Sequence, residues 1–306
     1  EGVLTRRLQN DPELPGTGLV IFDEVHERNL TTDLGLSLAL DVASTIRPDL
    51  RLLAMSATPD IEGLTQLLDA PVVESAGRMF DVVMHWVPRS SAGGDRGSRG
   101  RRAGKPGRPT PGGGRRIEPD VVAVVQRALR EQPGDLLVFL PGIGEIRRTE
   151  ELLRERVGLD VDVYPLAGAL SLVEQDRALA PSPPGRRRVV LATDIAETSL
   201  TVEGVHVVID SGLAREPRFD ARSGMTRLTT VSTSRASAEQ RAGRAGRTGP
   251  GAAYRLWSKI EHGTRTKYRS PEILQADLAG FALELAGWGG GDALRFIDQP
   301  PNGALA

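Results

Sequence analysis

Residues 18–24 read GLVIFDE, an apolar run that ends on two acids. An uninterrupted apolar run of this length is typical of a strand buried on both faces of a parallel sheet. A helix is predicted next, with Thr31 or Thr32 as its N-cap. Its apolar positions recur at helical spacing and are Leu34, Leu38, Val42 and Ile46. Residues 50–55, LRLLAM, are again strand-like, so this part of the chain alternates strand and helix.

The same alternation recurs further along the chain and predicts an α/β fold with right-handed crossovers. We expect helices over residues 117–131, 145–157, 171–179 and 236–243, and strands over 136–140, 161–166, 189–192, 205–209 and 252–257. A hairpin is expected over residues 215–231, turning at Arg222-Ser223-Gly224. A last helix is expected to begin at Ser270-Pro271-Glu272 and to continue to Gly287.

The composition excludes several classes of protein. The chain has 306 residues, of which 39% are hydrophobic, so we expect two domains with real cores and exclude a wholly disordered chain. It has no Cys and four His, which excludes disulfides, Cys nucleophiles and Cys-ligated zinc. No apolar run reaches the roughly 18 residues that span a membrane. The first residues, EGVLTRR, do not resemble a signal peptide, and a start on Glu1 within a pattern indicates a fragment.

The net charge of −1 hides an uneven distribution. Residues 89–116 hold nine Lys or Arg and one Asp, a net charge of +8, which leaves −9 for the rest of the chain. They also hold nine Gly, three Pro and no large apolar side chain. Such a segment buries too little surface to offset its ordering entropy, so we expect it to be disordered. It is either a loop insertion or an Arg/Gly arm that adds sequence-independent affinity for nucleic acid.

The most unusual polar stretches follow the predicted strands. They are DEVH at 23–26, SAT at 56–58, Thr193-Asp194 and Asp210. Because ligands of open α/β sheets bind outside the carboxyl ends of the strands, we expect these stretches to gather at that edge. Asp210 can also simply cap the end of its strand.

The acid pair at the end of the first strand suits metal-assisted hydrolysis. One carboxylate, Asp23, can hold a hydrated Mg²⁺ ion. The other, Glu24, can accept a proton from an attacking water. Alone, the pair is equally explained by a helix cap or a salt bridge.

A basic motif, QRAGRAGR, occupies residues 240–247. Arg244 and Arg247 are three residues apart and share a face of a helical turn. The interleaved Ala and Gly allow a phosphate chain to approach the guanidinium groups, which can spread the charge of phosphoryl transfer. Alone, the motif is equally explained by a solvated basic face.

Six motifs occur in one order along the chain: DEVH, SAT, LVFLPG, PLAGAL, ATDIAETSLT and QRAGRAGR. In this order and spacing they resemble the DEAH-box family of superfamily 2 RNA helicases. The stretch VVIDSGLAREPRFDARSGMTRL resembles most the bacterial HrpB-type branch. The tail from PEILQADLAG to FIDQPP looks like the start of the winged-helix domain of that family.

The resemblance implies two RecA-like parallel-sheet domains that bind ATP and Mg²⁺ between them and single-stranded or structured RNA across their tops. Residues 1–88 would be the C-terminal half of the first domain and 89–116 a basic insert. Residues 117–262 would be the second domain, and 263–306 the start of a helical winged-helix domain. The hairpin at 215–231 resembles one that the family places near the point of strand separation.

The same resemblance assigns roles to single residues. Asp23 would bind Mg²⁺ and Glu24 would be the general base. Gln240 would position the attacking water, with Arg244 and Arg247 as arginine fingers. The remaining implied positions are His26, Ser56 and Thr58 for coupling, Ser199 and Thr201 for nucleotide contacts, and Gly2, Thr193 and Thr198 for the RNA backbone.

Two departures from the family pattern stand out. Leu179 occupies the position at which the family often stacks an aromatic on adenine, and the opposing Arg would be Arg6 or Arg7. The phosphate loop G-x-x-x-x-G-K-[ST] is absent, since the single Gly-Lys pair, Gly104-Lys105, is followed by Pro106. We therefore expect these 306 residues alone not to hydrolyse ATP, whereas a longer parent protein would.

Two alternatives stay open from the sequence. A catalytically inactive RNA-binding or scaffold protein with helicase architecture would be expected to lose its acids and fingers, and Glu24, Gln240, Arg244 and Arg247 are all present. DNA as a partner is not distinguished from RNA, because that distinction depends on contacts to 2′-hydroxyl groups. We expect a cytoplasmic, monomeric protein without membrane contact.

Overall fold

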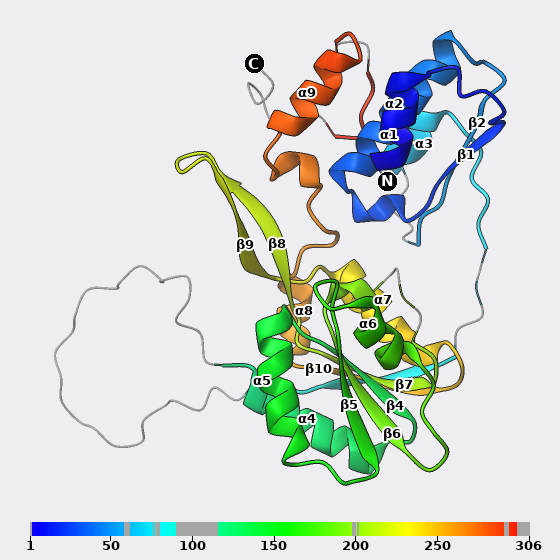
Figure 1. Cartoon of the computed structure of the whole chain (residues 1–306). Coiled ribbons are helices and arrows are strands. Elements are labelled where there is room, and N and C mark those ends of the chain that lie inside the picture. The colour runs from blue at the N-terminus through cyan, green and yellow to red at the C-terminus, as the bar shows by residue number, and fades with distance from the viewer. Residues whose placement is uncertain are drawn as a thin grey trace. The chain divides into compact units, whose positions relative to one another are not determined.

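The computed structural model divides the chain into two compact units (Figure 1), each made of segments far apart in sequence. The first unit comprises Glu1–Gly77, Arg215–Thr229 and Lys267–Ala306; the second comprises Arg78–Ala214 and Thr230–Thr266. The structure describes residues 2–57, 62–75, 77, 80–89, 116–197, 200, 202–290 and 294–298. None of the helices in these ranges is both long and apolar enough to cross a membrane.

The first unit contains a two-stranded parallel sheet and several helices. Its elements are α1 (Gly2–Asn10), β1 (Leu19–Phe22), η1 (Val25–Glu27), α2 (Leu30–Thr45), β2 (Arg51–Ala54), α3 (Glu62–Leu68), η4 (Glu272–Leu274) and α9 (Ala279–Gly287). The register runs from Leu19 opposite Arg51 to Phe22 opposite Ala54. Both strands and the intervening helix were expected from the sequence, and the parallel pairing confirms that part of the α/β prediction.

One face of β1 is buried and the other is open. Val20 and Phe22 pack into the core with residues of α2, whereas Leu19 is 48% exposed and Ile21 52% exposed. The expectation that this strand is buried on both faces is therefore wrong within the described residues, because α2 supplies apolar side chains to one face only.

The end of the chain shares the core of the first unit. Phe281 and Leu285 of α9 belong to the same buried cluster as Leu8 of α1 and Leu34 and Leu38 of α2. The sequence placed the start of a separate domain at residue 263, but these apolar positions of α9 bury their surface in the first unit.

The single helix expected from Ser270 to Gly287 is wrong, because it is divided in two. A 3₁₀ turn, η4, ends at Leu274, and α9 begins at Ala279. The Asp277 side chain accepts a hydrogen bond from the Ala279 amide at 3.0 Å, which favours a new helix start there.

The second unit is built on a six-stranded parallel sheet with the order β3-β10-β7-β4-β6-β5. Its strands are β3 (Val82–Trp86), β4 (Asp135–Phe139), β5 (Val161–Leu166), β6 (Arg187–Ala192), β7 (Val205–Asp210) and β10 (Gly251–Arg255). Its helices are α4 (Glu118–Glu131), α5 (Ile143–Arg154), α6 (Leu172–Leu179), η2 (Asp194–Ala196), α7 (Arg235–Gly243), η3 (Arg244–Gly246) and α8 (Lys259–Thr264). These elements confirm the alternation predicted from residue 117 onward.

Strand β3 was not expected from the sequence. It pairs in parallel with β10, from Val82 opposite Gly251 to Trp86 opposite Arg255. The second unit thus begins before the basic insert, and residues 80–89 belong to it rather than to the segment expected to end at 88. The reason is that β10 offers a free edge to which an apolar strand can add its hydrogen bonds.

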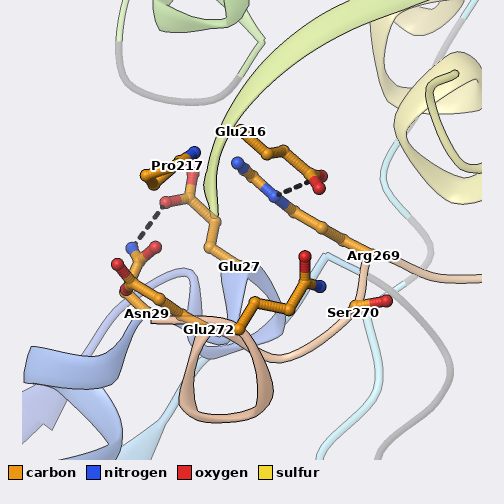
Figure 2. Close-up of a pocket in the computed structure, with 8 residues that line it drawn as sticks. Glu27, Asn29, Glu216, Pro217, Arg269, Ser270 and Glu272 are labelled. Atoms are coloured by element: carbon orange, nitrogen blue, oxygen red, sulfur yellow. Dashed lines mark hydrogen bonds and ion pairs between the residues drawn. The ribbon is translucent and has the colours of Figure 1, made fainter. Parts of the chain in front are cut away.

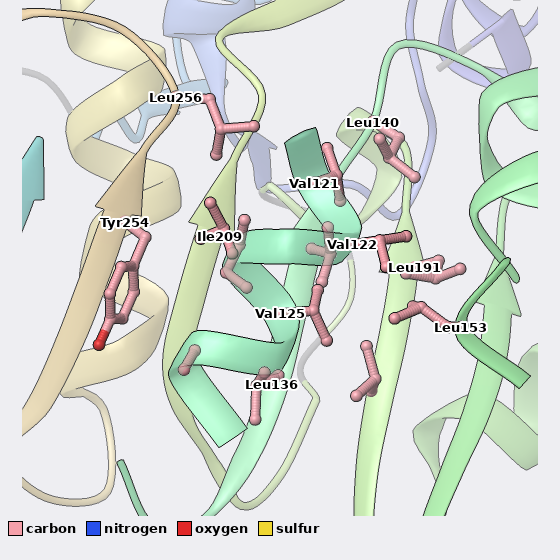
Figure 3. Close-up of a cluster of buried hydrophobic side chains, with 14 of the residues drawn as sticks. Val121, Val122, Val125, Leu136, Leu140, Leu153, Leu191, Ile209, Tyr254 and Leu256 are labelled. Carbon is pink, nitrogen blue, oxygen red and sulfur yellow. The ribbon is translucent and has the colours of Figure 1, made fainter. Parts of the chain in front are cut away.

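Both faces of the central strand β4 are buried. Leu136 and Val138 lie in one cluster with Val121 and Val125 of α4 (Figure 3). Leu137 and Phe139 lie in a second cluster. Because alternate side chains of a strand point to opposite faces, helices must cover both sides of this sheet, as its uninterrupted apolar strands predict.

The predicted hairpin is present and carries the expected turn. It consists of β8 (Leu213–Asp220) and β9 (Met225–Ser232). Asp220 Oδ1 accepts a hydrogen bond from the Arg222 amide at 3.0 Å, and Gly224 has φ +64°. A side-chain acceptor followed by a left-handed Gly is a standard way to close such a turn.

Candidate active site

In the first unit, the DEVH stretch and residues 55–57, which lead into the SAT motif, lie side by side beyond the ends of two paired strands. The Met55 amide donates to the Phe22 carbonyl at 2.8 Å, and the Val25 amide donates to the Met55 carbonyl at 3.1 Å. The ladder between β1 and β2 thus continues into the turn that carries the acids. The expectation that Asp23 and Ser56 follow neighbouring strands is met by this register.

The backbone at Glu24 is strained. Its φ of 53° and ψ of 36° lie in the left-handed region, which costs a residue with a Cβ about 1–2 kcal/mol. The Asp23 carboxylate accepts a hydrogen bond from the Glu24 amide at 2.8 Å and helps to hold this conformation. Such strain persists only where the surroundings impose it, and it is concentrated at functional sites.

His26 connects the two stretches. Its Nδ1 accepts a hydrogen bond from the Ala57 amide at 3.3 Å and lies 3.4 Å from Glu24 Oε2. These contacts exclude each other chemically, because an unprotonated Nδ1 can accept from the amide whereas only a protonated one can donate to the carboxylate. The His26 side chain is 8% exposed, so its ring is held in place between Glu24 and the SAT loop.

The acids suit a hydrated magnesium ion. Asp23 is exposed at the end of β1, and Glu24 is next to it. Among the described residues no group of three His, Asp or Glu side chains is arranged to hold a metal. Mg²⁺ commonly takes one or two carboxylates and completes its shell with water and substrate phosphates. The donor set therefore fits Mg²⁺ bound together with a nucleotide.

A buried carboxylate, Asp33, lies at the start of α2, the helix that follows the DEVH turn. Asp33 in the first turn of α2 is paired with Arg28 at 3.3 Å, and Arg28 also reaches Asp298 at 2.6 Å. Burial raises the pKa of Asp33, and the opposing charge of Arg28 offsets only part of that effect.

In the second unit, an ion network fixes α7 to the carboxyl edge of the sheet. The Arg241 guanidinium donates to Asp210 Oδ1 at 3.0 Å and to Glu197 Oε2 at 2.8 Å. Arg241 is 1% exposed and Asp210 2%. Burial alone would lower the pKa of Arg241, but the charges of Asp210 and Glu197 outweigh burial and raise it. The buried guanidinium of Arg241 is therefore held charged by its two carboxylate partners.

Arg244 is buried rather than presented to solvent. It is 5% exposed, and its guanidinium donates to the Glu197 carbonyl and, at 2.9 Å, to the Leu200 carbonyl. It therefore ties the QRAGRAGR motif to the loop that follows η2. Arg247 is exposed just beyond η3, and Gln240 is half-buried on α7. The two expected arginine fingers thus have different surroundings.

The other predicted site residues are spread over several elements. Thr193 is the N-cap residue of η2 and is half-buried at the end of β6. Leu179 ends α6 and packs partly against the second cluster of the sheet. Gly2 begins α1 and is exposed. Thr58, Thr198, Ser199, Thr201 and residues 90–115 of the basic insert lie outside the described residues.

Sequence reasoning missed the network around Arg241. Glu197 and Arg241 stand within recognised motifs, yet neither was given a role, and Asp210 was interpreted as a possible strand cap. Asp210 Oδ1 does accept a hydrogen bond from the Gly212 amide at 2.8 Å, and it also binds Arg241. The available signal was an acid at the end of an otherwise apolar strand, since a buried charge requires a partner.

Part of the chain matches a known domain family. Residues 120–249 match the family model described as the helicase conserved C-terminal domain. The chain is 47% identical over 98% of its length to the ATP-dependent RNA helicase HrpB of Escherichia coli (strain K12), of which it covers 35%. It is 35% identical over 99% of its length to the probable ATP-dependent RNA helicase DHX34 of Homo sapiens, of which it covers 26%.

Solved structures show the same fold. A crystal structure of the E. coli DExH-box NTPase HrpB matches 100% of this chain and 35% of that one, with a TM-score of 0.85 and 47% identity. A crystal structure of the Escherichia coli DEAH/RHA helicase HrpB matches 98% of this chain and 36% of that one, with a TM-score of 0.86. The chain spans about a third of the length of this relative.

Proposed function

Because the chain belongs to the DEAH-box helicases, in the HrpB-type branch, we propose that it forms part of an ATP-dependent RNA helicase. Its reaction would be the hydrolysis of Mg²⁺-bound ATP, coupled to movement along RNA or to its unwinding. RNA is the proposed partner and ATP and Mg²⁺ the proposed cofactors. We also propose a cytoplasmic location.

One observation carries the hydrolytic part of this proposal. His26, two residues after the strained Glu24, accepts a hydrogen bond at Nδ1 from the Ala57 amide. A turn with two acids needs no such arrangement for stability, but a general base must be held in one orientation toward the water it activates. In our proposal Asp23 holds Mg²⁺, which neutralises phosphate charge when bound, and Glu24 takes the proton of the attacking water.

The second unit supplies the remaining groups in this proposal. Gln240 orients the water, and Arg247 contributes positive charge to the transferred phosphoryl group. Arg244 acts through its hydrogen bonds to the loop at Glu197 and Leu200 as well as through its charge. His26 and Ser56 are proposed to couple hydrolysis to domain movement, together with Thr58.

We further propose that these 306 residues alone do not turn over ATP, because the sequence contains no G-x-x-x-x-G-K-[ST] loop. The test compares the chain with a loop fusion, in which a DEAH-box phosphate-loop segment precedes residue 1. The fusion is expected to hydrolyse ATP in the presence of RNA, and Glu24→Gln should lower its turnover about 10²–10⁴-fold. Glu13→Gln, an exposed acid of the same unit, serves as the matched control.

Two results would contradict this proposal. RNA-stimulated turnover by the chain alone, abolished by Glu24→Gln, would show that no phosphate loop is needed. A fusion that binds RNA and ATP but hydrolyses ATP no faster than the Glu24→Gln variant would favour the inactive RNA-binding alternative.

Binding to RNA is tested separately by its dependence on salt. The affinity of the chain for a labelled oligouridylate is measured over a range of salt concentrations, with and without residues 90–115. If the basic insert is an RNA-binding arm, its removal lowers the slope of log affinity against log salt by roughly 0.7 for each phosphate that the arm neutralises. An unchanged slope assigns the segment to a loop insertion.

A further inference from the structure

A short segment of the first unit, residues 269–275, contacts the turn that follows DEVH. The Glu272 amide donates to the Arg28 carbonyl at 3.0 Å. In return, the Glu272 carboxylate accepts a hydrogen bond from the Leu30 amide at 2.7 Å. The adjoining Ile273 is 1% exposed and lies in the core of the unit, which anchors the segment.

Glu272 replaces the missing cap of α2. Thr31 and Thr32, the expected N-caps, lie inside the helix, and Asn29 occupies the N-cap position without a side-chain hydrogen bond to the helix. The first amides of a helix need acceptors, and a negative charge is stabilising at a helix N-terminus. A residue 242 positions away in sequence therefore fixes the beginning of α2.

The same segment holds the hairpin. The Phe219 amide of β8 donates to the Gln275 carbonyl at 2.9 Å. Arg269 Nε lies 3.4 Å from Glu216 Oε1. Figure 2 shows the pocket between these parts, where Glu27 and Asn29 of the turn face Glu216 and Pro217 of the hairpin.

The hairpin presents basic side chains to solvent. Arg218, Arg222 and Arg227 are all exposed on β8, the turn and β9. Exposed guanidinium groups on an extended ribbon can contact phosphates without reading sequence. If RNA bound to the hairpin displaced it, the displacement would reach residues 269–275 through the hydrogen bond between Phe219 and Gln275.

We propose that Glu272 is a positioning residue through which the hairpin and the DEVH turn move together. The inference rests on the proposed function for the role of Glu24 and for RNA as the ligand of the hairpin. The link itself rests on two backbone hydrogen bonds and one carboxylate, spread over only four residues of η4 and its C-cap. Displacement of this short turn shifts the Arg28 carbonyl and the Phe219 amide at once.

The first test measures amide hydrogen exchange in the 306-residue chain. Glu272→Ala is expected to raise exchange at the Leu30 amide about tenfold, since one charge-assisted hydrogen bond is removed. It is also expected to raise exchange at the Phe219 amide. Glu272→Gln keeps an acceptor and should raise Leu30 exchange less, and it remains informative if the Ala variant does not fold.

The matched control is Glu284→Ala. Glu284 lies on α9 of the same unit and accepts a hydrogen bond from the Gln9 side chain. Its removal should leave exchange at both Leu30 and Phe219 unchanged. Faster exchange at Leu30 in the Glu272 variants, with Phe219 exchange equal to that of the unaltered chain, would overturn the proposal.

The second test adds an oligouridylate probe. Protection of residues 216–228 by the probe should alter exchange at residues 24–30 in the unaltered chain and in Glu284→Ala, but not in Glu272→Ala. A protected hairpin with unchanged exchange at 24–30 in the unaltered chain would overturn the inference. Absence of any binding would instead contradict RNA as the partner, and the first test would still decide whether the link exists.

Discussion

Asp210 Oδ1 lies 3.0 Å from a guanidinium nitrogen of Arg241, and both side chains are at most 2% exposed. The pair joins the end of β7 to α7, the helix within which the QRAGRAGR motif starts. Because Glu197 binds the same guanidinium at 2.8 Å, the loop after β6 is joined to both. Two motifs of the second unit and the end of β7 are thus fixed by one buried cation.

Removal of one partner of this network is expected to destabilise the second unit strongly. Arg241→Ala leaves the buried carboxylate of Asp210 and the half-buried one of Glu197 without a cation. Removal of one partner from a buried ion pair typically costs about 3–5 kcal/mol. Urea unfolding of the chain measures this change. Arg154→Ala is the matched control, because its ion pair with Glu150 is on an exposed helix surface and is worth about 0.5 kcal/mol or less. Equal destabilisation in the two variants would show that the buried network is not structural.

Substitution of the two expected arginine fingers, Arg244 and Arg247, should destabilise the chain to different degrees. Arg244→Ala removes a buried guanidinium that donates to the carbonyls of Glu197 and Leu200, and it is expected to cost about 2–4 kcal/mol in urea unfolding. Arg247→Ala, at an exposed position, should cost about 0.5 kcal/mol or less. It should nevertheless lower turnover of the loop fusion by about 10³-fold or more. A stable Arg244→Ala variant would remove its proposed structural role.

Two glycines offer a matched pair for backbone and packing effects. Both Gly212 and Gly224 have positive φ, +73° and +64°. A Cβ at Gly212 would lie 2.6 Å from atoms of Arg265 and Trp257, whereas one at Gly224 meets nothing within 4 Å. We expect Gly224→Ala to cost about 1 kcal/mol from backbone strain and Gly212→Ala about 2–4 kcal/mol. Thermal unfolding of the two variants makes the comparison.

The loss of stability at acid pH should depend in part on Asp49. Two hydrogen bonds from Arg47, at 2.8 and 2.7 Å, lower the pKa of Asp49 from 3.8 to about 2. Because its pKa is lowered in the folded chain, the ionised Asp49 carboxylate stabilises the folded state. This stabilisation is present above pH 3.8 and disappears as the pH falls toward about 2. In Asp49→Asn, the midpoint of unfolding should therefore fall less steeply than in the unaltered chain as the pH is lowered from 3.8 to about 2. An identical decline in the variant would contradict the assignment.

The sequence predicted the second unit well because its strands carry uninterrupted apolar runs. β4, with Leu136 to Phe139 buried on both faces, leaves little ambiguity. β3 was missed because His85 and Trp86 interrupt its apolar pattern and its hydrogen bonds come from β10, far along the chain. Pairing between distant segments is not encoded in local periodicity.

The sequence predicted which residues form the candidate site better than it predicted their backbone conformation and burial. The positions of Asp23 and Ser56 at adjoining strand ends follow from topology alone. The left-handed turn at Glu24 and the burial of Arg244 do not, because both are imposed by tertiary contacts. Likewise, no local signal shows that α2 takes its cap from Glu272, since helix-capping rules consider only neighbouring residues.

The three-part construction of the first unit has a consequence for folding, because its core joins segments far apart in sequence. Its core needs Leu8 and Leu38 from the beginning of the chain and Phe281 and Leu285 from near the end. The second unit is made of Arg78–Ala214 and Thr230–Thr266. A nascent chain can therefore complete the second unit while apolar residues of the first still await their partners on the ribosome. Contacts of such long sequence separation form slowly, so we expect the core of the first unit to form after that of the second.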